Sequence, residues 1–263
     1  MSLSLSRGPR RIVCLTEEPT EILYRLGEGE RVVGISAFTL RPPEARRDKP
    51  IVSAFIGGSV HKIRALEPDL VIGFSDIQAE LAKQLIQANL PVLIFNQRSL
   101  QEILDVILDL GRLVDRKHEA EGLVAGYVQR LDGLASAAAR RQWRPRVYFE
   151  EWDEPMISAI RWVSELITIA GGRDVFEPRS HGKLAKERFV TVQEVLRDDP
   201  EVVLASWCGK AFDRAAFEAR PGFAALAAVR HGRVYEVPPE IILQPGPACL
   251  TDGLDFLLDA LKE

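Results

Sequence analysis

The sequence lacks the features that mark a disulfide scaffold, a membrane span or a strongly charged binding surface. Its three cysteines, Cys14, Cys208 and Cys249, cannot all pair and form no CxxC motif, so we expect neither a disulfide framework nor a structural zinc site. No apolar run reaches the roughly 20 residues of a transmembrane helix. The net charge is −4 and no block of like charge occurs, which gives no reason to expect nucleic acid or membrane insertion.

Catalytic signatures are also missing. There is no Walker A loop, GxGxxG, GxSxG or HExxH motif, and the four histidines show no metal-ligand spacing. Carboxylates occur in pairs at 17–18 and 150–151, but no nucleophile accompanies them. We therefore expect polar recognition and not catalysis, with no cofactor and no bound metal.

The first ten residues, MSLSLSRGPR, are polar and lack the apolar core of a signal peptide. This leaves two alternatives open for the compartment. Either the protein is cytoplasmic, or the sequence begins after a removed leader and the protein is periplasmic or otherwise extracytoplasmic.

The central feature is a predicted helix over 117–142, about 39 Å long at 1.5 Å per residue. Its apolar residues recur at three- and four-residue steps and form one stripe: Ala120, Leu123, Val124, Tyr127, Leu131, Leu134 and Ala138. The sequence on both sides of this helix follows a similar plan. We therefore predict an N-terminal α/β lobe (1–114), a bridging helix (115–144) and a C-terminal α/β lobe (145–263), with a ligand cleft between the lobes.

Short apolar runs alternate with amphipathic segments in both halves. The predicted strands are 11–15, 31–36, 51–55, 69–74, 91–96, 146–152, the second part of 189–207, and 233–238. The predicted helices are 16–27, 60–68, 77–90, 99–114, 162–172, the first part of 189–207, and 248–262, while 37–50 is predicted to be a loop. This alternation predicts two Rossmann-like lobes with parallel sheets covered on both faces.

Ligands of open parallel sheets bind beyond the carboxyl ends of the strands, and this rule selects the candidate site residues. In the first lobe they are Glu17, Glu18, Phe38, Phe55, Asp76 and Asn96; in the second they are Trp152, Trp162, Trp207, Lys210 and Glu240. Flat apolar rings with a few polar groups suit a broad hydrophobic ligand. The alternative is that the tryptophans are core residues.

Several of these segments resemble a known family. The run RIVCLTEEPTEILYRLGEGERVVGIS (11–36), IRALEPDLVIGF (63–74), the long helix and the repeated second lobe are similar to substrate-binding proteins of vitamin B12 and ferric-siderophore ABC transporters. RWVSELITIAGG (161–172), SWCGK (206–210) and ILQPGPA (242–248) favour the cobalamin-binding branch.

The resemblance implies a two-lobed fold with one bridging helix, and aromatic contacts to a corrin ring from Phe55, Trp152, Trp162 and Trp207. It also implies docking to a permease through one acidic residue on each lobe. The matching positions hold His61 in the first lobe and Gln193, followed by Glu194, in the second. The first position is therefore not a carboxylate.

The leading hypothesis is a monomeric binding protein of an ABC importer, which holds a cobalamin-like corrinoid. The alternative within the same fold is a ferric-siderophore or haem binder, for which Arg161, Lys183 and Lys210 are available cations. A third hypothesis is a cytoplasmic enzyme that processes a corrinoid or metal chelate, for which His181 and Glu17 are the candidate residues.

Overall fold

The computed structural model describes residues 8–262. Residues 1–7, which carry most of the segment considered as a leader, lie outside the described part. The chain divides into two compact units, the first formed by residues 1–97 and 101–126 and the second by 98–100 and 127–263. Both units are α/β, as predicted.

The first unit contains a five-stranded sheet in the order β3-β2-β1-β4-β5, with parallel pairing throughout. Its strands are β1 (Ile12–Cys14), β2 (Val32–Ser36), β3 (Ile51–Ser53), β4 (Leu70–Phe74) and β5 (Val92–Phe95). All five were expected from the apolar runs. The strands β1 and β4 are almost fully buried, because helices cover both faces of a parallel sheet.

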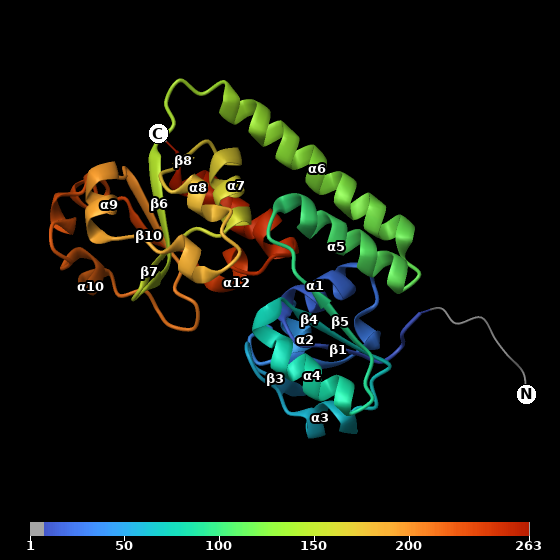
Figure 1. The fold of residues 1–263 in the computed structure, drawn as a ribbon. Coiled ribbons are helices and arrows are strands. Elements are labelled where there is room, and N and C mark those ends of the chain that lie inside the picture. Colours follow the sequence, from blue (N-terminus) through green and yellow to red (C-terminus); the bar gives the residue numbers. More distant parts are fainter. Residues whose placement is uncertain (1–7, 263) are drawn as a thin grey trace, which may run out of the picture. The chain divides into compact units, whose positions relative to one another are not determined.

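The helices of this unit are α1 (Glu17–Arg25), α2 (Pro43–Asp48), α3 (Val60–Ala65) and α4 (Ala79–Gln87), with 3-10 turns at Gly29–Arg31 and Asp76–Gln78. In Figure 1, α1 and α4 lie on opposite sides of β1 and β4. The prediction of a loop over 37–50 is wrong, since α2 lies within it. Pro43 begins this helix at the position where a proline ring costs no hydrogen bond.

Two longer helices follow, α5 (Leu100–Leu113) and α6 (Lys117–Ala139). The predicted long helix is confirmed as α6, which ends at Ala139, three residues before the predicted end at 142. Ala120, Tyr127, Leu131 and Ala138 are buried along it, as the apolar stripe required. The boundary between the two units falls within α6, after Gly126.

The second unit contains a sheet in the order β10-β9-β6-β7, with β8 also paired to β6. Its strands are β6 (Arg146–Asp153), β7 (Met156–Ser158), β8 (Arg173–Asp174), β9 (Val202–Ala205) and β10 (Val234–Glu236). The prediction of a purely parallel sheet is wrong here, because β7 pairs with β6 in the antiparallel sense. A tight turn at 154–155 reverses the chain directly, and no helix is needed for such a connection.

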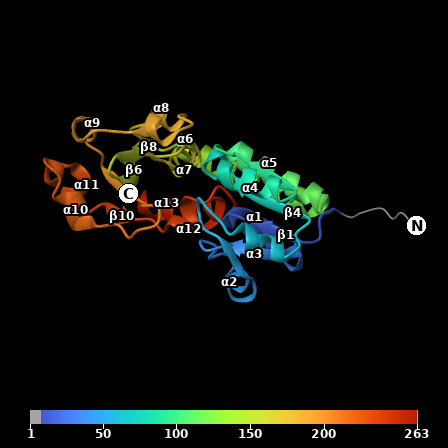
Figure 2. The same cartoon turned by 60° about the horizontal axis from the view of Figure 1, so that its bottom comes forward.

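The helices of the second unit are α7 (Arg161–Ile169), α8 (Glu177–Ser180), α9 (Val192–Asp198), α10 (Arg214–Glu218), α11 (Ala227–Arg230), α12 (Pro239–Ile242) and α13 (Leu254–Ala260). There are 3-10 turns at Ala185–Arg188 and Phe223–Ala225, and a π-helical turn at Cys249–Gly253 leads into α13. Figure 2 shows α10 and α11 near β10. Between β6, β9 and these short helices lies an aromatic core that includes Tyr148, Phe176, Phe217 and Phe223.

All three cysteines are free, as predicted. Across the described residues, none of the helices combines the length and apolar character needed to cross a membrane.

Candidate ligand-binding site

The carboxyl ends of the parallel strands in the first unit carry exposed apolar side chains. Phe38 and Leu40 follow β2, Ile56 follows β3 and Ile77 follows β4, and their exposed fractions are 42%, 47%, 65% and 40%. Phe55, which is half-buried, meets Phe38 edge to face with ring centroids 6.3 Å apart. Exposing this much apolar surface at one edge of a sheet is typical of a binding surface.

The polar candidates of this edge divide into exposed and buried side chains. Asp76 and Asn96 are exposed, in agreement with the strand-end rule. Glu17 and Glu18 are only 2% and 3% exposed. The Oε1 atom of Glu17 accepts a hydrogen bond from the backbone N–H of Leu40 at 2.8 Å. The hydrogen bonds that these two carboxylates form are with groups of the first unit itself. A direct contact with a ligand stays a prediction.

Glu18 lies in an unusual environment for a carboxyl group. Burial raises its pKa to about 7, against the opposing effect of hydrogen bonds from backbone and from Thr16. The hydroxyl of Thr16 donates to its Oε1 at 2.9 Å. Near neutral pH this carboxyl is therefore partly protonated inside the unit.

Gln78 is a buried residue of this edge that the sequence did not single out. Its Nε2 donates to the backbone oxygen of Phe55 at 2.9 Å, and its Oε1 accepts from the backbone N–H of Phe74 at 3.0 Å. It thereby fixes the loop that presents Phe55 against the end of β4. The sequence offered only a glutamine four residues after the end of β4, and this signal is too weak to select it.

In the second unit, the carboxyl end of β6 holds a completely buried carboxylate. Glu150 is 0% exposed and accepts hydrogen bonds from the hydroxyl of Tyr148 at 2.8 Å and from Nε1 of Trp207 at 3.0 Å. Arg220 binds both of its oxygens, at 2.5 and 3.0 Å. Because burial and the neighbouring carboxylate disfavour a phenolate, the pKa of Tyr148 lies well above its ordinary value. The network orients the indole of Trp207.

A second ion pair stabilises the next residue of the strand. The guanidinium of Arg188, which is 4% exposed, binds Glu151 at 2.6 and 2.9 Å and the backbone oxygen of Ser158 at 2.7 Å. This pair connects the 3-10 turn Ala185–Arg188 to the β6–β7 hairpin. Phe189, the next residue, forms a β-bridge with Ile157.

The third charge pair at this edge involves Lys210. Its ammonium nitrogen lies 2.7 Å from Oδ2 of Asp153. The same nitrogen lies 4.6 Å from the ring centre of Trp152 and 4.7 Å from that of Trp207. Burial raises the pKa of Asp153, but the hydrogen bonds from Lys210 and from backbone amides outweigh it, and the net pKa lies below the ordinary value.

The three candidate tryptophans therefore have different environments. Trp152 is half-buried, whereas Trp207 and Trp162 are each 3% exposed. Trp162 lies in α7, and its Nε1 donates to the backbone oxygen of Ile242 at 2.9 Å. This hydrogen bond attaches α12, the helix that carries Glu240, to α7. The expectation of exposed indoles is wrong for Trp162 and Trp207. The ring of Trp162 packs inside the unit, whereas that of Trp207 is covered by Phe212 and by the ammonium group of the partly exposed Lys210.

Exposed apolar residues of this unit occur elsewhere. Phe189 is 40% exposed and Leu184 is 42% exposed. Ile157 pairs with Phe189 on one side and with Trp152 on the other, so it lies between these two aromatic residues. The sequence analysis missed Phe189 because FVTV resembles the start of a buried strand or helix. Its backbone is extended, and its neighbours Arg188 and Val190 are both buried, so the side chain of Phe189 points the other way, toward solvent.

The residues proposed for permease docking lie on short helices. His61 is exposed in the first turn of α3, and Gln193 is exposed in the first turn of α9. Glu194 is occupied within its own unit, because it completes a capping box with Thr191 and forms an ion pair with Arg179. Their role in docking stays a prediction.

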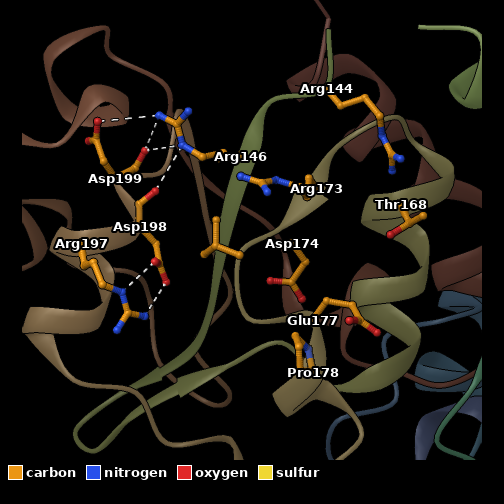
Figure 3. A pocket seen from close by; sticks show the side chains of 11 residues that line it. Arg144, Arg146, Thr168, Arg173, Asp174, Glu177, Pro178, Arg197, Asp198 and Asp199 are labelled. Atoms are coloured by element: carbon orange, nitrogen blue, oxygen red, sulfur yellow. Dashed lines mark hydrogen bonds and ion pairs between the residues drawn. The ribbon is translucent and has the colours of Figure 1, made fainter. Parts of the chain in front are cut away.

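A large pocket of the second unit is separate from the predicted site. Its volume is about 890 Å³, and its lining includes Arg146 and Arg173, the first residues of β6 and β8. It therefore lies at the amino ends of these strands. Figure 3 shows its ion pairs, with Arg146 bound to the 198–199 turn and Arg197 bound to Asp198.

A smaller pocket of about 440 Å³ lies between α7 and α8 and is lined by Arg161 and His181, among others. His181 contacts Glu177 at 2.9 Å, and Arg161 is paired with Glu165. Among the described residues there is no group of three or more histidine, cysteine or acidic side chains that could hold a metal ion. Neither pocket contains a residue selected by the strand-end rule, but the smaller one includes Arg161 and His181, the candidates for the anionic-chelate and enzyme hypotheses.

Comparison with known proteins identifies the family. The model of the family described as periplasmic binding protein matches residues 12–241. The chain belongs to this family. The predicted resemblance and the two-unit α/β fold are thereby confirmed.

Three similar proteins define the range of relatives. The uncharacterized ABC transporter substrate-binding lipoprotein YvrC of Bacillus subtilis is 25% identical over 98% of this chain and 82% of its own length. The crystal structure of the periplasmic vitamin B12 binding protein BtuF of Vibrio cholerae has a TM-score of 0.74 and 26% identity, over 96% of both chains. The apo periplasmic heme-binding protein RhuT from Roseiflexus sp. RS-1 has a TM-score of 0.80 and 26% identity, over 97% of this chain and 100% of its own.

The comparisons show a substrate-binding protein of an ABC transporter, of the type that binds vitamin B12, haem or siderophores. Such proteins bind small ligands and work with a permease, and the relatives are binding proteins and not enzymes. Vitamin B12 and haem are transported ligands in these relatives and not cofactors.

Proposed function

We propose that this chain is the extracytoplasmic substrate-binding protein of an ABC importer and that its ligand is a cobalamin-like corrinoid. The observation that carries the proposal is the set of exposed apolar side chains at the strand ends of the first unit: Phe38, Leu40, Ile56 and Ile77. A broad, mostly apolar ring system is the ligand class that such a surface binds.

Charge supports a ligand with an uncharged rim. At the carboxyl end of β6, the acids Glu150, Glu151 and Asp153 are paired one to one with Arg220, Arg188 and Lys210. An anionic chelate usually requires cations that converge on it. Of the cations considered for an anionic chelate, Arg161 pairs with Glu165 on α7, and Lys210 pairs with Asp153. Amide groups on a corrin rim need hydrogen-bonding partners and no net charge, and Asp76 and Asn96 are exposed beside the apolar surface.

The size of the apolar contribution is sufficient for useful affinity. Burial of about 200–300 Å² of apolar surface contributes roughly 5–8 kcal/mol at about 25 cal/mol/Å², before the cost of association. Phe55, a partly exposed ring of the same edge, adds to this. In the second unit we assign Trp152 and Phe189, which are also partly exposed, to ligand contacts. Trp162 and Glu240 we assign to positioning, through the bond from α7 to α12.

Equilibrium dialysis against cyanocobalamin, haemin and a ferric siderophore tests the ligand. We expect cyanocobalamin to bind in the micromolar range or tighter. Neither haemin nor the ferric siderophore should displace it at equal concentration. Phe38→Ala should weaken its binding roughly tenfold, since partial burial of one ring is worth about 1–2 kcal/mol.

Ile86→Ala is the matched control. Ile86 is 61% exposed, but it lies near the carboxyl end of α4, away from the strand ends. The control should bind cyanocobalamin like the unchanged protein. Equal weakening by both substitutions, or binding of haemin in place of cyanocobalamin, would overturn the assignment.

A haem ligand is the second candidate, and one side chain favours it. His61 is exposed at the start of α3, the helix that follows β3, and imidazole is a common axial ligand of haem iron. If haemin binds, His61→Ala should remove the histidine signature from its absorption spectrum. For permease docking we retain His61 and Gln193 as the exposed positions, to be tested by transport with His61→Glu and Gln193→Glu.

A further inference from the structure

The aromatic surface of the second unit already has an occupant, and it belongs to the same chain. The ammonium nitrogen of Lys210 lies 4.6 Å from the ring centre of Trp152 and 4.7 Å from that of Trp207. Both distances are within the range of a cation–π interaction. Asp153 completes the arrangement with a 2.7 Å contact to the same nitrogen. We name these four residues the Lys210 cage.

The local backbone brings the lysine to this place. Gly209 has a φ of +83°, a left-handed conformation that favours glycine. It turns the chain so that Lys210 lies over the ring of Trp207, three residues earlier. No atom lies within 4 Å of the position that a Cβ of Gly209 would occupy, so the turn is not confined by its surroundings.

The two sides of the cage differ in rigidity. Trp207 is 3% exposed and is fixed by its hydrogen bond to the buried Glu150 and by an edge contact with Phe212, with ring centroids 5.0 Å apart. The side chain of Lys210 is 42% exposed and is held by contacts that are individually weak at a surface. Trp152 is half-buried, and its Nε1 donates to the backbone oxygen of Glu154 at 2.9 Å. Each indole is therefore held by a hydrogen bond within the unit, and the lysine is the part that can leave.

We propose that Lys210 is a specificity-determining residue of this protein: its ammonium group covers indole faces of Trp152 and Trp207, and a ligand gains those faces only by displacing it. This inference rests on the proposed function, because it takes the carboxyl end of β6 as part of the ligand surface. A flat ring large enough to cover both indoles replaces the lysine. A small ligand that covers only one of them leaves the Lys210 cage closed.

Lys210→Ala empties the cage and is the principal test. We expect the variant to bind cyanocobalamin about tenfold more tightly in equilibrium dialysis, since two cation–π contacts and one exposed ion pair no longer compete. In the absence of ligand, acrylamide should quench its tryptophan fluorescence more strongly than that of the unchanged protein. Trp152→Phe in the same background should remove most of this increase.

Two further variants separate displacement from other roles. Lys210→Arg keeps a cation over the rings and should leave the affinity for cyanocobalamin unchanged or weaker. Lys186→Met removes an exposed lysine of the same unit and should change neither affinity nor quenching. Asp153→Asn removes the ion pair of Lys210 without emptying the cage, and it should tighten cyanocobalamin binding by a smaller factor than Lys210→Ala. This variant provides the test if Lys210→Ala does not fold.

The outcomes distinguish this inference from the proposed function. Weaker or unchanged binding of cyanocobalamin by Lys210→Ala would overturn the displacement role, and weaker binding would instead indicate a direct contact to the ligand. Failure of the unchanged protein to bind cyanocobalamin would overturn the proposed function. In that case unchanged acrylamide quenching in Lys210→Ala would overturn the cage itself, whereas increased quenching would support it.

Discussion

Glu18 provides the sharpest test of how the first unit is built. Its side chain is 3% exposed, and its Oε1 accepts a hydrogen bond from Thr16. Burial raises its pKa from 4.5 to about 7. Glu18→Gln keeps the size and the acceptor oxygen of this side chain but removes its ability to ionise.

The sign of the effect follows from proton linkage. The folded protein binds this proton more tightly than the unfolded chain, so the contribution of Glu18 to stability is complete below about pH 4.5 and declines as the pH rises through about 7. The difference of about 2.5 pKa units corresponds to about 3 kcal/mol as an order of magnitude. The nearby thiol of Cys14 does not titrate in this window, since burial raises its pKa to about 12.

Urea unfolding at several values between about pH 5 and about pH 8 measures the effect. The free energy of unfolding of Glu18→Gln should fall less over this range than that of the unchanged protein, by about 2–3 kcal/mol. Glu80→Gln is the matched control, because Glu80 is an exposed acid in the first turn of α4, and its pH profile should follow the unchanged protein. Parallel profiles for Glu18→Gln and the unchanged protein would refute the assignment of a buried carboxyl that titrates near neutrality.

Three predictions concern the second unit. Arg220→Met leaves the carboxylate of Glu150 buried without its cation and should lower the free energy of unfolding by about 3–5 kcal/mol; a loss below about 1 kcal/mol in urea unfolding would contradict the network described here. Trp162→Phe removes the hydrogen bond to the backbone oxygen of Ile242 and should lower the free energy of unfolding by about 1–3 kcal/mol. Thermal unfolding measures this loss, and an unchanged midpoint would show that the bond does not stabilise the unit. Burial raises the pKa of Asp174 from 3.8 to about 6, so its contribution to stability is lost as the pH rises through about 6. Asp174→Asn should therefore flatten the stability profile between about pH 4 and about pH 7 by about 2–3 kcal/mol. A profile that keeps the slope of the unchanged protein would argue against a proton on this group.

Local periodicity was sufficient to predict most elements and the edge that carries the candidate site. The alternation of apolar runs with amphipathic segments located β1 to β5, and the apolar stripe located α6 within three residues of its end. The strand-end rule then selected Phe38 and Phe55, which the structure brings into ring contact. These predictions succeed because they depend on patterns that repeat every two or three to four residues, which the chain itself specifies.

The environment of each side chain at that edge was decided by contacts between residues far apart in the sequence. Trp207 is buried because Glu150, 57 residues earlier, accepts its N–H. Phe189 is exposed although it begins an apolar run, and the predicted parallel sheet contains the antiparallel β7 because a two-residue turn reverses the chain.

The sequence by itself thus determined the family, the succession of helices and strands, and the strand ends at which a ligand is expected. Only the tertiary structure decided which candidate rings are exposed, which carboxylates are neutralised and where Lys210 places its charge. The physical reason is that secondary structure follows from local spacing, whereas burial and charge pairing depend on which distant residues fold against each other.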